Sequence, residues 1–199
     1  MEMALENQDL GMPYSEMNKP LLSVIMVCYN HENYVAQAIE SILQQKTQFP
    51  YELIIGDDCS GDNTAGIIRK YSIDYPAIIN AFVHSVNKGM VANIAGLLKQ
   101  SKGKYIAFCD GDDYWHNPDK IQLQIEYMES HPETGLVYGD INQFFQSEGR
   151  MVECYHRVSK TPFHSGNIFN ELLLSKYYFI KTATACLRKE ILDKFYDYN

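Results

Sequence analysis

The chain has 199 residues, of which 46% are hydrophobic and 21% charged, a balance typical of a globular protein with one full core. Its formal net charge of −8 argues against a nucleic-acid partner, because binding a phosphate backbone needs clustered lysines and arginines. An acidic protein can still bind one nucleotide if a metal ion neutralises the phosphates. The composition therefore leaves small phosphate ligands open.

The five cysteines form no CxxC pair, and two of them, Cys28 and Cys109, lie inside apolar runs. This pattern predicts reduced thiols in a cytoplasmic protein rather than a disulfide framework or a zinc site. No apolar run reaches the ~18 residues of a membrane span. Residues 1–20 are acidic and lack a secretion-signal pattern. We therefore expect a flexible arm over residues 1–20, then a single domain over residues 21–199.

Strands and helices alternate in the first part of the chain. Apolar runs rich in Val and Ile predict buried strands over residues 21–29, 51–56, 78–84 and 105–109. Apolar residues at helical spacing predict a helix after each of the first three strands, the first over residues 34–45. The order βαβαβαβ predicts a parallel sheet with helices on both faces.

The rest of the chain predicts a smaller, antiparallel part. Pro118 and Pro132 bracket a fourth helix. The expected elements after it are a strand over residues 135–145, an antiparallel neighbour over 151–158, a helix over 163–174, a strand over 182–187 and a helix over 189–195.

Three carboxylates, Asp110, Asp112 and Asp113, follow the fourth strand within four residues. Negative charges packed at the end of a buried strand are unfavourable unless a cation joins them. Mg²⁺ and Mn²⁺ prefer carboxylate oxygens and usually keep positions open for substrate phosphates. The run therefore indicates a metal–phosphate site. An exposed acidic turn after an edge strand is the alternative interpretation.

Polar clusters also end the first two strands, as Tyr29-Asn30 and as Asp57-Asp58. The carboxyl ends of parallel strands meet at one edge of a sheet, where α/β proteins bind their ligands. We therefore expect both clusters and the acidic run to share one crevice.

Four segments, SVIMVCYN, IIGDDCSGDNT, NKG and GKYIAFCDGDDYW, together resemble a family-2 glycosyltransferase of the GT-A fold. The resemblance runs from Leu21 to about Asp193. It implies a Rossmann-like, mostly parallel sheet flanked by helices, with a small antiparallel C-terminal part. It also implies an inverting transfer of a sugar from a nucleoside-diphosphate sugar, with UDP or dTDP as the expected nucleotide and Mg²⁺ or Mn²⁺ as the cofactor.

The resemblance assigns the nucleotide base to the ends of the first two strands. Val27, Tyr29 and Asn30 occupy the positions that hold the base in the family, with the tyrosine ring packed on or beside it. Asp58 occupies the position that accepts a hydrogen bond from the base imide. Guanine also has such an N–H group, so these residues do not determine which nucleotide base is bound.

The resemblance assigns the diphosphate and the metal to later loops. Lys88 falls in a loop that lies near the diphosphate in the family. Asn93 lies on the next helix, where family members carry a polar residue that faces the donor. Within the DxD-type acidic run, Asp112 matches the carboxylate that contacts the ribose and Asp113 the metal ligand, with Asp110 beside them. We expect Asp112 to contribute to the metal site as well.

The general base of such an enzyme would lie downstream of the segment TATACLRKEILDKF, beyond Asn199. We therefore expect an incomplete GT-A domain that binds a nucleoside diphosphate with metal and transfers sugar poorly. The family also implies a glycan or lipid-linked acceptor in surface polysaccharide biosynthesis, at the inner face of the membrane with peripheral attachment. A homodimer is compatible with the resemblance.

Two alternatives to a transferase remain at this point. A phosphatase of the haloacid dehalogenase type would use Asp110 as its nucleophile, but Tyr114 stands where that class has Thr or Val. A non-catalytic nucleotide-binding fragment would keep the same crevice without the transfer reaction.

Overall fold

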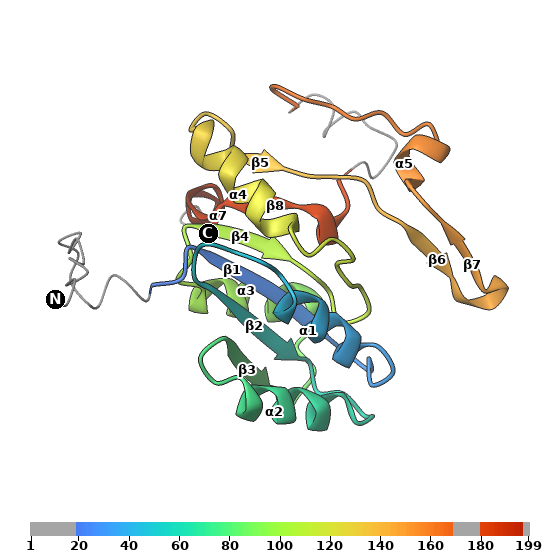
Figure 1. The fold of residues 1–199 in the computed structure, drawn as a ribbon. Helices are drawn as coiled ribbons and strands as arrows, with labels where there is room; N and C mark the ends of the chain where they lie inside the picture. Colours follow the sequence, from blue (N-terminus) through green and yellow to red (C-terminus); the bar gives the residue numbers. More distant parts are fainter. Residues whose placement is uncertain (1–18, 169–179, 197–199) are drawn as a thin grey trace, which may run out of the picture.

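The computed structural model describes residues 19–168 and 180–196 and contains a six-stranded sheet in the order β3-β2-β1-β4-β8-β5 (Figure 1). The first four strands run parallel: β1 (Leu22–Cys28), β2 (Tyr51–Asp57), β3 (Ile79–Val83) and β4 (Tyr105–Phe108). The short strand β8 (Cys186–Arg188) runs antiparallel to both β4 and β5 (Leu136–Val137). The predicted α/β fold with a mostly parallel sheet is confirmed.

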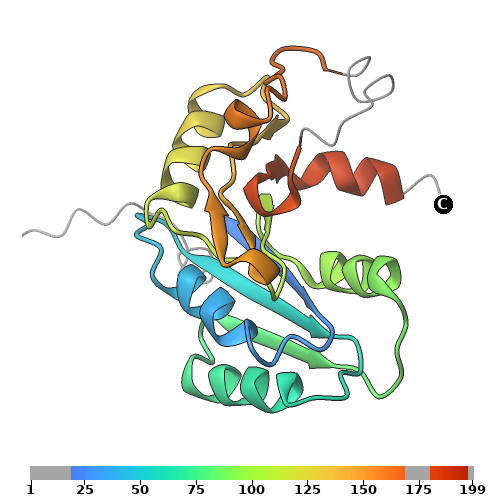
Figure 2. The same cartoon turned by 90° about the vertical axis from the view of Figure 1, so that its right-hand side faces the viewer.

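Helices cover both faces of the sheet, because successive side chains of each strand point to opposite sides. Three helices pack with Val24 and Met26 of β1 on one face: α1 (Val35–Leu43), α2 (Thr64–Asp74) and α4 (Lys120–Ser130). On the other face, α3 (Met90–Gln100) and α7 (Lys189–Tyr196) pack with Ile25 and Val27 of the same strand. Figure 2 shows α3 and α7 on the opposite side of the sheet from α1. All seven residues of β1 are buried, which accounts for its continuous apolar run.

The single strand predicted over residues 135–145 is wrong. Its first part is β5 in the main sheet, whereas β6 (Gln143–Phe145) pairs antiparallel with β7 (Arg150–Val152) in a separate hairpin closed by the 3-10 turn η1 (Gln146–Glu148). The hairpin lies apart from the main sheet (Figure 1). Asp140 interrupts the strand, because its carboxylate accepts the backbone N–H groups of Ile141 and His156, each at 2.8 Å.

Other predictions about this half of the chain hold only in part. The antiparallel pairing with residues 151–158 stops at Val152, since Tyr155–Val158 forms the short helix α5. Residues 163–168 are not helical, and the remainder of the helix predicted over 163–174 lies outside the described residues. The predicted strand over 182–187 begins instead as the 3-10 turn η2 (Thr182–Thr184).

Side chains, rather than a neighbouring strand, bind two of the carbonyl groups of η2. Trp115 Nε1 donates to the Ala183 carbonyl at 2.8 Å, and Gln124 Nε2 donates to the Thr184 carbonyl at 2.8 Å.

No helix within the described ranges, 19–168 and 180–196, is both long enough and apolar enough to cross a membrane.

Candidate functional site

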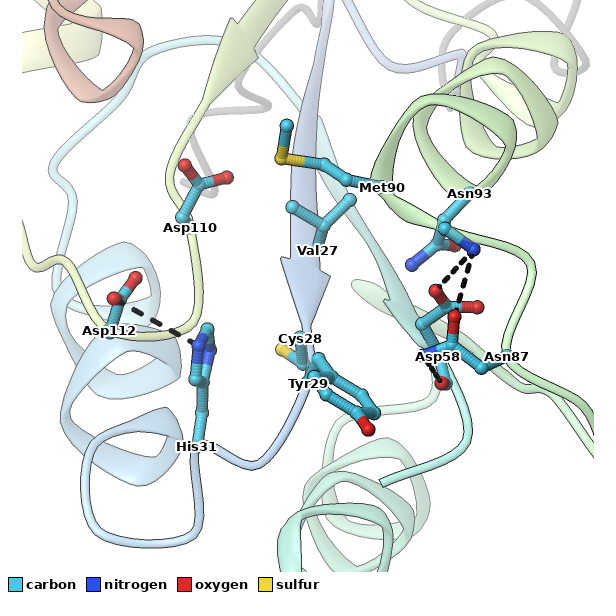
Figure 3. A pocket seen from close by; sticks show the side chains of 11 residues that line it. Val27, Cys28, Tyr29, His31, Asp58, Asn87, Met90, Asn93, Asp110 and Asp112 are labelled. Atoms are coloured by element: carbon cyan, nitrogen blue, oxygen red, sulfur yellow. Dashed lines mark hydrogen bonds and ion pairs between the residues drawn. The ribbon is translucent and has the colours of Figure 1, made fainter. Parts of the chain in front are cut away.

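The carboxyl ends of β1, β2 and β4 border a cavity of about 490 Å³. Figure 3 shows the end of β1 in the middle, with Asp58 on one side of it and Asp110 and Asp112 on the other. Six of the residues predicted from the sequence line the cavity: Val27, Tyr29, Asp58, Asn93, Asp110 and Asp112. Asn30, Lys88 and Asp113 are not among the lining residues.

Asp58 is held by the turn that follows β3. Its Oδ1 accepts the Lys88 backbone N–H at 2.7 Å and its Oδ2 accepts that of Gly89 at 2.8 Å. Gly89 has φ of +81°, a conformation that glycine adopts easily, so the turn can wrap around the carboxylate. Each carboxylate oxygen has two lone pairs, so Asp58 keeps acceptor capacity toward the cavity. The side chain is therefore fixed and still able to accept a ligand's hydrogen bond.

Lys88 contributes its backbone, and not its ammonium group, to this arrangement. The Lys88 Nζ lies 3.2 Å from His84 Nδ1, on the α3 side of the turn. The neighbouring Asn93 is 1% exposed; its Nδ2 donates to the Gly56 carbonyl at 2.9 Å, and its Oδ1 lies 3.2 Å from His84 Nε2. Both ends of this amide bind within the protein, so Asn93 forms the wall of the cavity.

The end of β1 presents one aromatic ring to the cavity. Tyr29 is 51% exposed and lines the cavity. The next residue, Asn30, adopts φ of +58° and turns toward the loop after β2. Its N–H donates to Ser60 Oγ at 2.9 Å, and its Oδ1 accepts the Gly61 N–H at 2.8 Å. Asn30 therefore joins two loops of the rim, and Tyr29 offers the free aromatic face.

The acidic run forms a tight loop directly after β4 in the chain. Gly111 N–H donates to the Val27 carbonyl at 3.0 Å, and Asp113 N–H donates to the Asp110 carbonyl at 3.0 Å. Since β4 lies between β1 and β8, the interpretation of the run as a turn after an edge strand is wrong. The loop directs Asp110 and Asp112 to the cavity, whereas Asp113 is not among the residues that line it.

This loop concentrates negative charge. Burial, followed by repulsion from Asp113 and Asp112, raises the pKa of Asp110 to about 6. Burial and then Asp112 raise the pKa of Asp113, whereas His31 opposes this shift. The pKa of the Cys28 thiol is also raised well above its ordinary value, by burial and then by Asp57, Asp110 and Asp112. A cation placed here would relieve this repulsion.

The donor set fits a divalent ion that is held partly by its substrate. Asp110 and Asp112 supply hard carboxylate oxygens at the cavity, and no group of three or more candidate metal ligands occurs among the described residues. Mg²⁺ and Mn²⁺ commonly bind through one or two carboxylates, with substrate phosphates and water as the other ligands.

Sequence reasoning missed several residues of the cavity: Cys28, His31, Asn87, Gly89 and Met90. Of these, His31 lies beside the acidic loop, with Nε2 3.9 Å from Asp112 Oδ2. Its position two residues after Tyr29, at the end of the first strand, was a signal that could have identified it.

The sequence model of a family described as "Glycosyl transferase family 2" matches residues 23–195. The putative glycosyltransferase EpsE of Bacillus subtilis is 38% identical over 112 residues, which cover 56% of this chain and 40% of that protein. The putative teichuronic acid biosynthesis glycosyltransferase TuaG of the same species is 37% identical over 114 residues, covering 55% and 42%.

Solved structures share the fold. TarS 1–349 of S. aureus in complex with UDP superposes with a TM-score of 0.62 at 23% identity, covering 87% of this chain and 48% of that one. The mannosyltransferase PcManGT of Pyrobaculum calidifontis, in complex with GDP-Man and Mn²⁺, gives a TM-score of 0.64 at 17% identity, covering 89% and 47%. The chain thus spans less than half the length of each of these relatives.

Proposed function

The chain belongs to glycosyl transferase family 2, and from this premise we propose that its cavity binds the nucleoside-diphosphate part of a sugar donor. The observation that carries the proposal is the shared cavity. Asp58, a fixed hydrogen-bond acceptor, lies on the α3 side of the cavity, and the aromatic ring of Tyr29 lies at its centre. The carboxylates of Asp110 and Asp112 lie at the other end. A nucleotide base can stack on an aromatic ring and donate to a fixed acceptor, whereas a diphosphate binds through a metal ion held by carboxylates. The two ends of the cavity therefore match the two parts of a nucleoside diphosphate.

We assign the base to the end formed by Tyr29 and Asp58. Stacking of a base on an aromatic side chain contributes about 1–3 kcal/mol. The remaining lone pairs of Asp58 suit the imide N–H of uracil or thymine, and Val27 supplies an apolar wall. The turn over Asn87–Gly89 that holds Asp58 makes this acceptor rigid before any ligand arrives.

We assign the metal ion, Mg²⁺ or Mn²⁺, to Asp110 and Asp112. When bound, such an ion supplies Lewis-acid stabilisation of the departing nucleoside diphosphate. The sequence assigned the metal to Asp113 and Asp112, but it is Asp110 and Asp112 that line the cavity. The crystallised PcManGT complex, which contains GDP-Man and Mn²⁺, supports a metal in a protein of this fold.

We further propose a glycan or lipid-linked glycan of the cell surface as the acceptor. The printed name of TuaG, a teichuronic acid biosynthesis glycosyltransferase, supports this class. We also propose one domain over residues 21–199, because the same sheet joins β1 near its start to β8 near its end.

Isothermal titration with UDP, dTDP and GDP, each with and without Mn²⁺, tests the proposal. We expect metal-dependent binding of at least one of them, weakened at least tenfold by Asp110→Asn or Asp112→Asn because a carboxylate oxygen is lost. Asp119→Asn is the matched control: it removes an exposed carboxylate from the same segment, outside the cavity. Absence of binding by all three nucleotides, or equal weakening by the control, would refute the proposal.

A further inference from the structure

The side chain of His31 faces the metal end of the cavity, and its backbone is fixed on both sides. Its N–H donates to Thr64 Oγ1 at 2.7 Å. Its carbonyl accepts the N–H groups of Tyr34 and Val35, each at 2.9 Å, at the start of α1. Because both backbone groups are bound, the ring has a defined place beside the acidic loop (Figure 3).

One edge of the imidazole ring packs against the acidic loop. A Cβ atom placed on Gly111 would lie 2.7 Å from His31 Nδ1, so the ring fills the space that a larger residue at position 111 would need. The Nδ1 atom is buried and has no hydrogen-bond partner. A proton on Nδ1 would therefore be a buried donor without an acceptor, which is unfavourable. The neutral ring consequently carries its proton on Nε2.

The Nε2 atom, unlike the buried Nδ1, lies toward Asp112, which lines the cavity together with His31. Its distance of 3.9 Å to Asp112 Oδ2 is too long for a hydrogen bond. The donor therefore lies beside the carboxylates without being bound by them, and an oxygen atom of a ligand in the cavity can accept its proton.

No lysine or arginine is among the described residues that line the cavity, and His31 offers an N–H donor there. Lys88 lies between two lining residues, Asn87 and Gly89, but its ammonium group contacts His84. A diphosphate brings several negative oxygens into a cavity that already contains Asp58, Asp110 and Asp112. An N–H group forms a strong, charge-assisted hydrogen bond with an ionised phosphate oxygen.

We propose that His31 binds the diphosphate of the donor through an Nε2–H···O hydrogen bond, at the end of the cavity where Asp110 and Asp112 lie. This inference rests on the proposed nucleotide-sugar function and adds a specific phosphate contact to it. In this role His31 holds the leaving group next to the carboxylates, in place of the lysine that the sequence indicated.

A matched pair of variants separates the donor from the bulk of the ring. His31→Gln keeps an N–H donor at a similar reach, whereas His31→Met has nearly the same length without a donor. We expect His31→Met to weaken UDP binding about tenfold or more, the loss of one charge-assisted hydrogen bond, and His31→Gln to stay within about threefold of the wild type. Binding of uridine, which has no phosphate, should be the same in all three proteins.

Titration calorimetry for UDP and NMR line-shape titration for uridine measure these constants, and repeating both in EDTA gives a metal-free readout. UDP affinity should be lower for every protein in EDTA, but the ratio of wild type to His31→Met should persist, because the contact is to phosphate rather than to a metal ligand. Equal UDP affinity of all three proteins, or parallel losses for UDP and uridine, would overturn the inference and leave the proposed function standing. If the wild type binds none of UDP, dTDP and GDP, both are overturned.

Discussion

Replacing Gly111 by alanine perturbs the acidic loop without touching any carboxylate. The added Cβ would lie 2.5 Å from Cys28 Sγ and 2.7 Å from His31 Nδ1, whereas ordinary contacts begin near 3.4 Å. Gly111 is not among the residues with positive φ, so the substitution introduces steric overlap and no backbone strain. Overpacking of this kind costs about 1–3 kcal/mol. Because the loop must move away from β1, we also expect metal-dependent nucleotide affinity to fall about tenfold.

A double-mutant cycle in urea unfolding measures whether this contact is the cause. Cys28→Ala removes the sulfur atom that the new methyl group meets, so Gly111→Ala should cost about 1 kcal/mol less in that background than in the wild type. Gly96→Ala is the control, since nothing lies within 4 Å of a Cβ there, and alanine in the helix α3 should stabilise the protein by up to about 1 kcal/mol. If Gly111→Ala is neutral, or if its cost is unchanged by Cys28→Ala, the tight packing of the loop against β1 is refuted.

Three further predictions concern the supports and the charge of the site. Asp58→Asn places an amide N–H₂ against one of the backbone N–H groups that the carboxylate binds, so we expect a loss of about 2–4 kcal/mol in urea unfolding together with weaker nucleotide binding. The pKa of Asp110 is raised to about 6 in the folded protein, so without metal its contribution to stability should be fully present below about pH 4, fall as the pH rises toward 6 and then level off. The pKa of Asp113 is also raised, so Asp110→Asn should reduce this fall without abolishing it. Trp115→Phe removes the donor to the Ala183 carbonyl at 2.8 Å while keeping a ring beneath Lys120, and should cost about 1 kcal/mol.

Each of these predictions has a result that contradicts it. Unchanged stability of Asp58→Asn would mean that the turn over Asn87–Gly89 does not depend on the carboxylate. If the metal-free wild type loses no more stability than Asp110→Asn between pH 4 and 6, the sign expected for a buried, repelled carboxyl group is wrong. A Trp115→Phe protein as stable as the wild type would show that the indole N–H does not hold η2 in place.

The parallel half of the fold could be predicted because its signals are local. The first strand is buried along its full length, so its apolar run identifies it without knowledge of its neighbours. Alternation with helices then fixes the parallel topology, and the topology brings Tyr29, Asp58 and the acidic run to one edge. This is why six of the predicted residues line one cavity.

The remaining features depend on contacts between distant residues, which periodicity does not encode. The break between β5 and β6 follows from Asp140 binding the backbone of His156, 16 residues away. The 3-10 turn η2 likewise depends on Trp115, 68 residues from Ala183. Such side-chain contacts override the local preference for a strand.

The most direct test of the central claim uses Mn²⁺ as a paramagnetic probe in NMR spectra of the isotope-labelled chain with UDP, with Mg²⁺ as the diamagnetic reference. We expect the backbone amide signals of Gly111 and Asp112 to broaden most strongly, with the signal of His31 next, and Asp110→Asn to reduce the effect greatly. Strongest broadening at another part of the chain, or equal broadening in Asp110→Asn, would contradict a metal–diphosphate site at the carboxyl edge of this sheet.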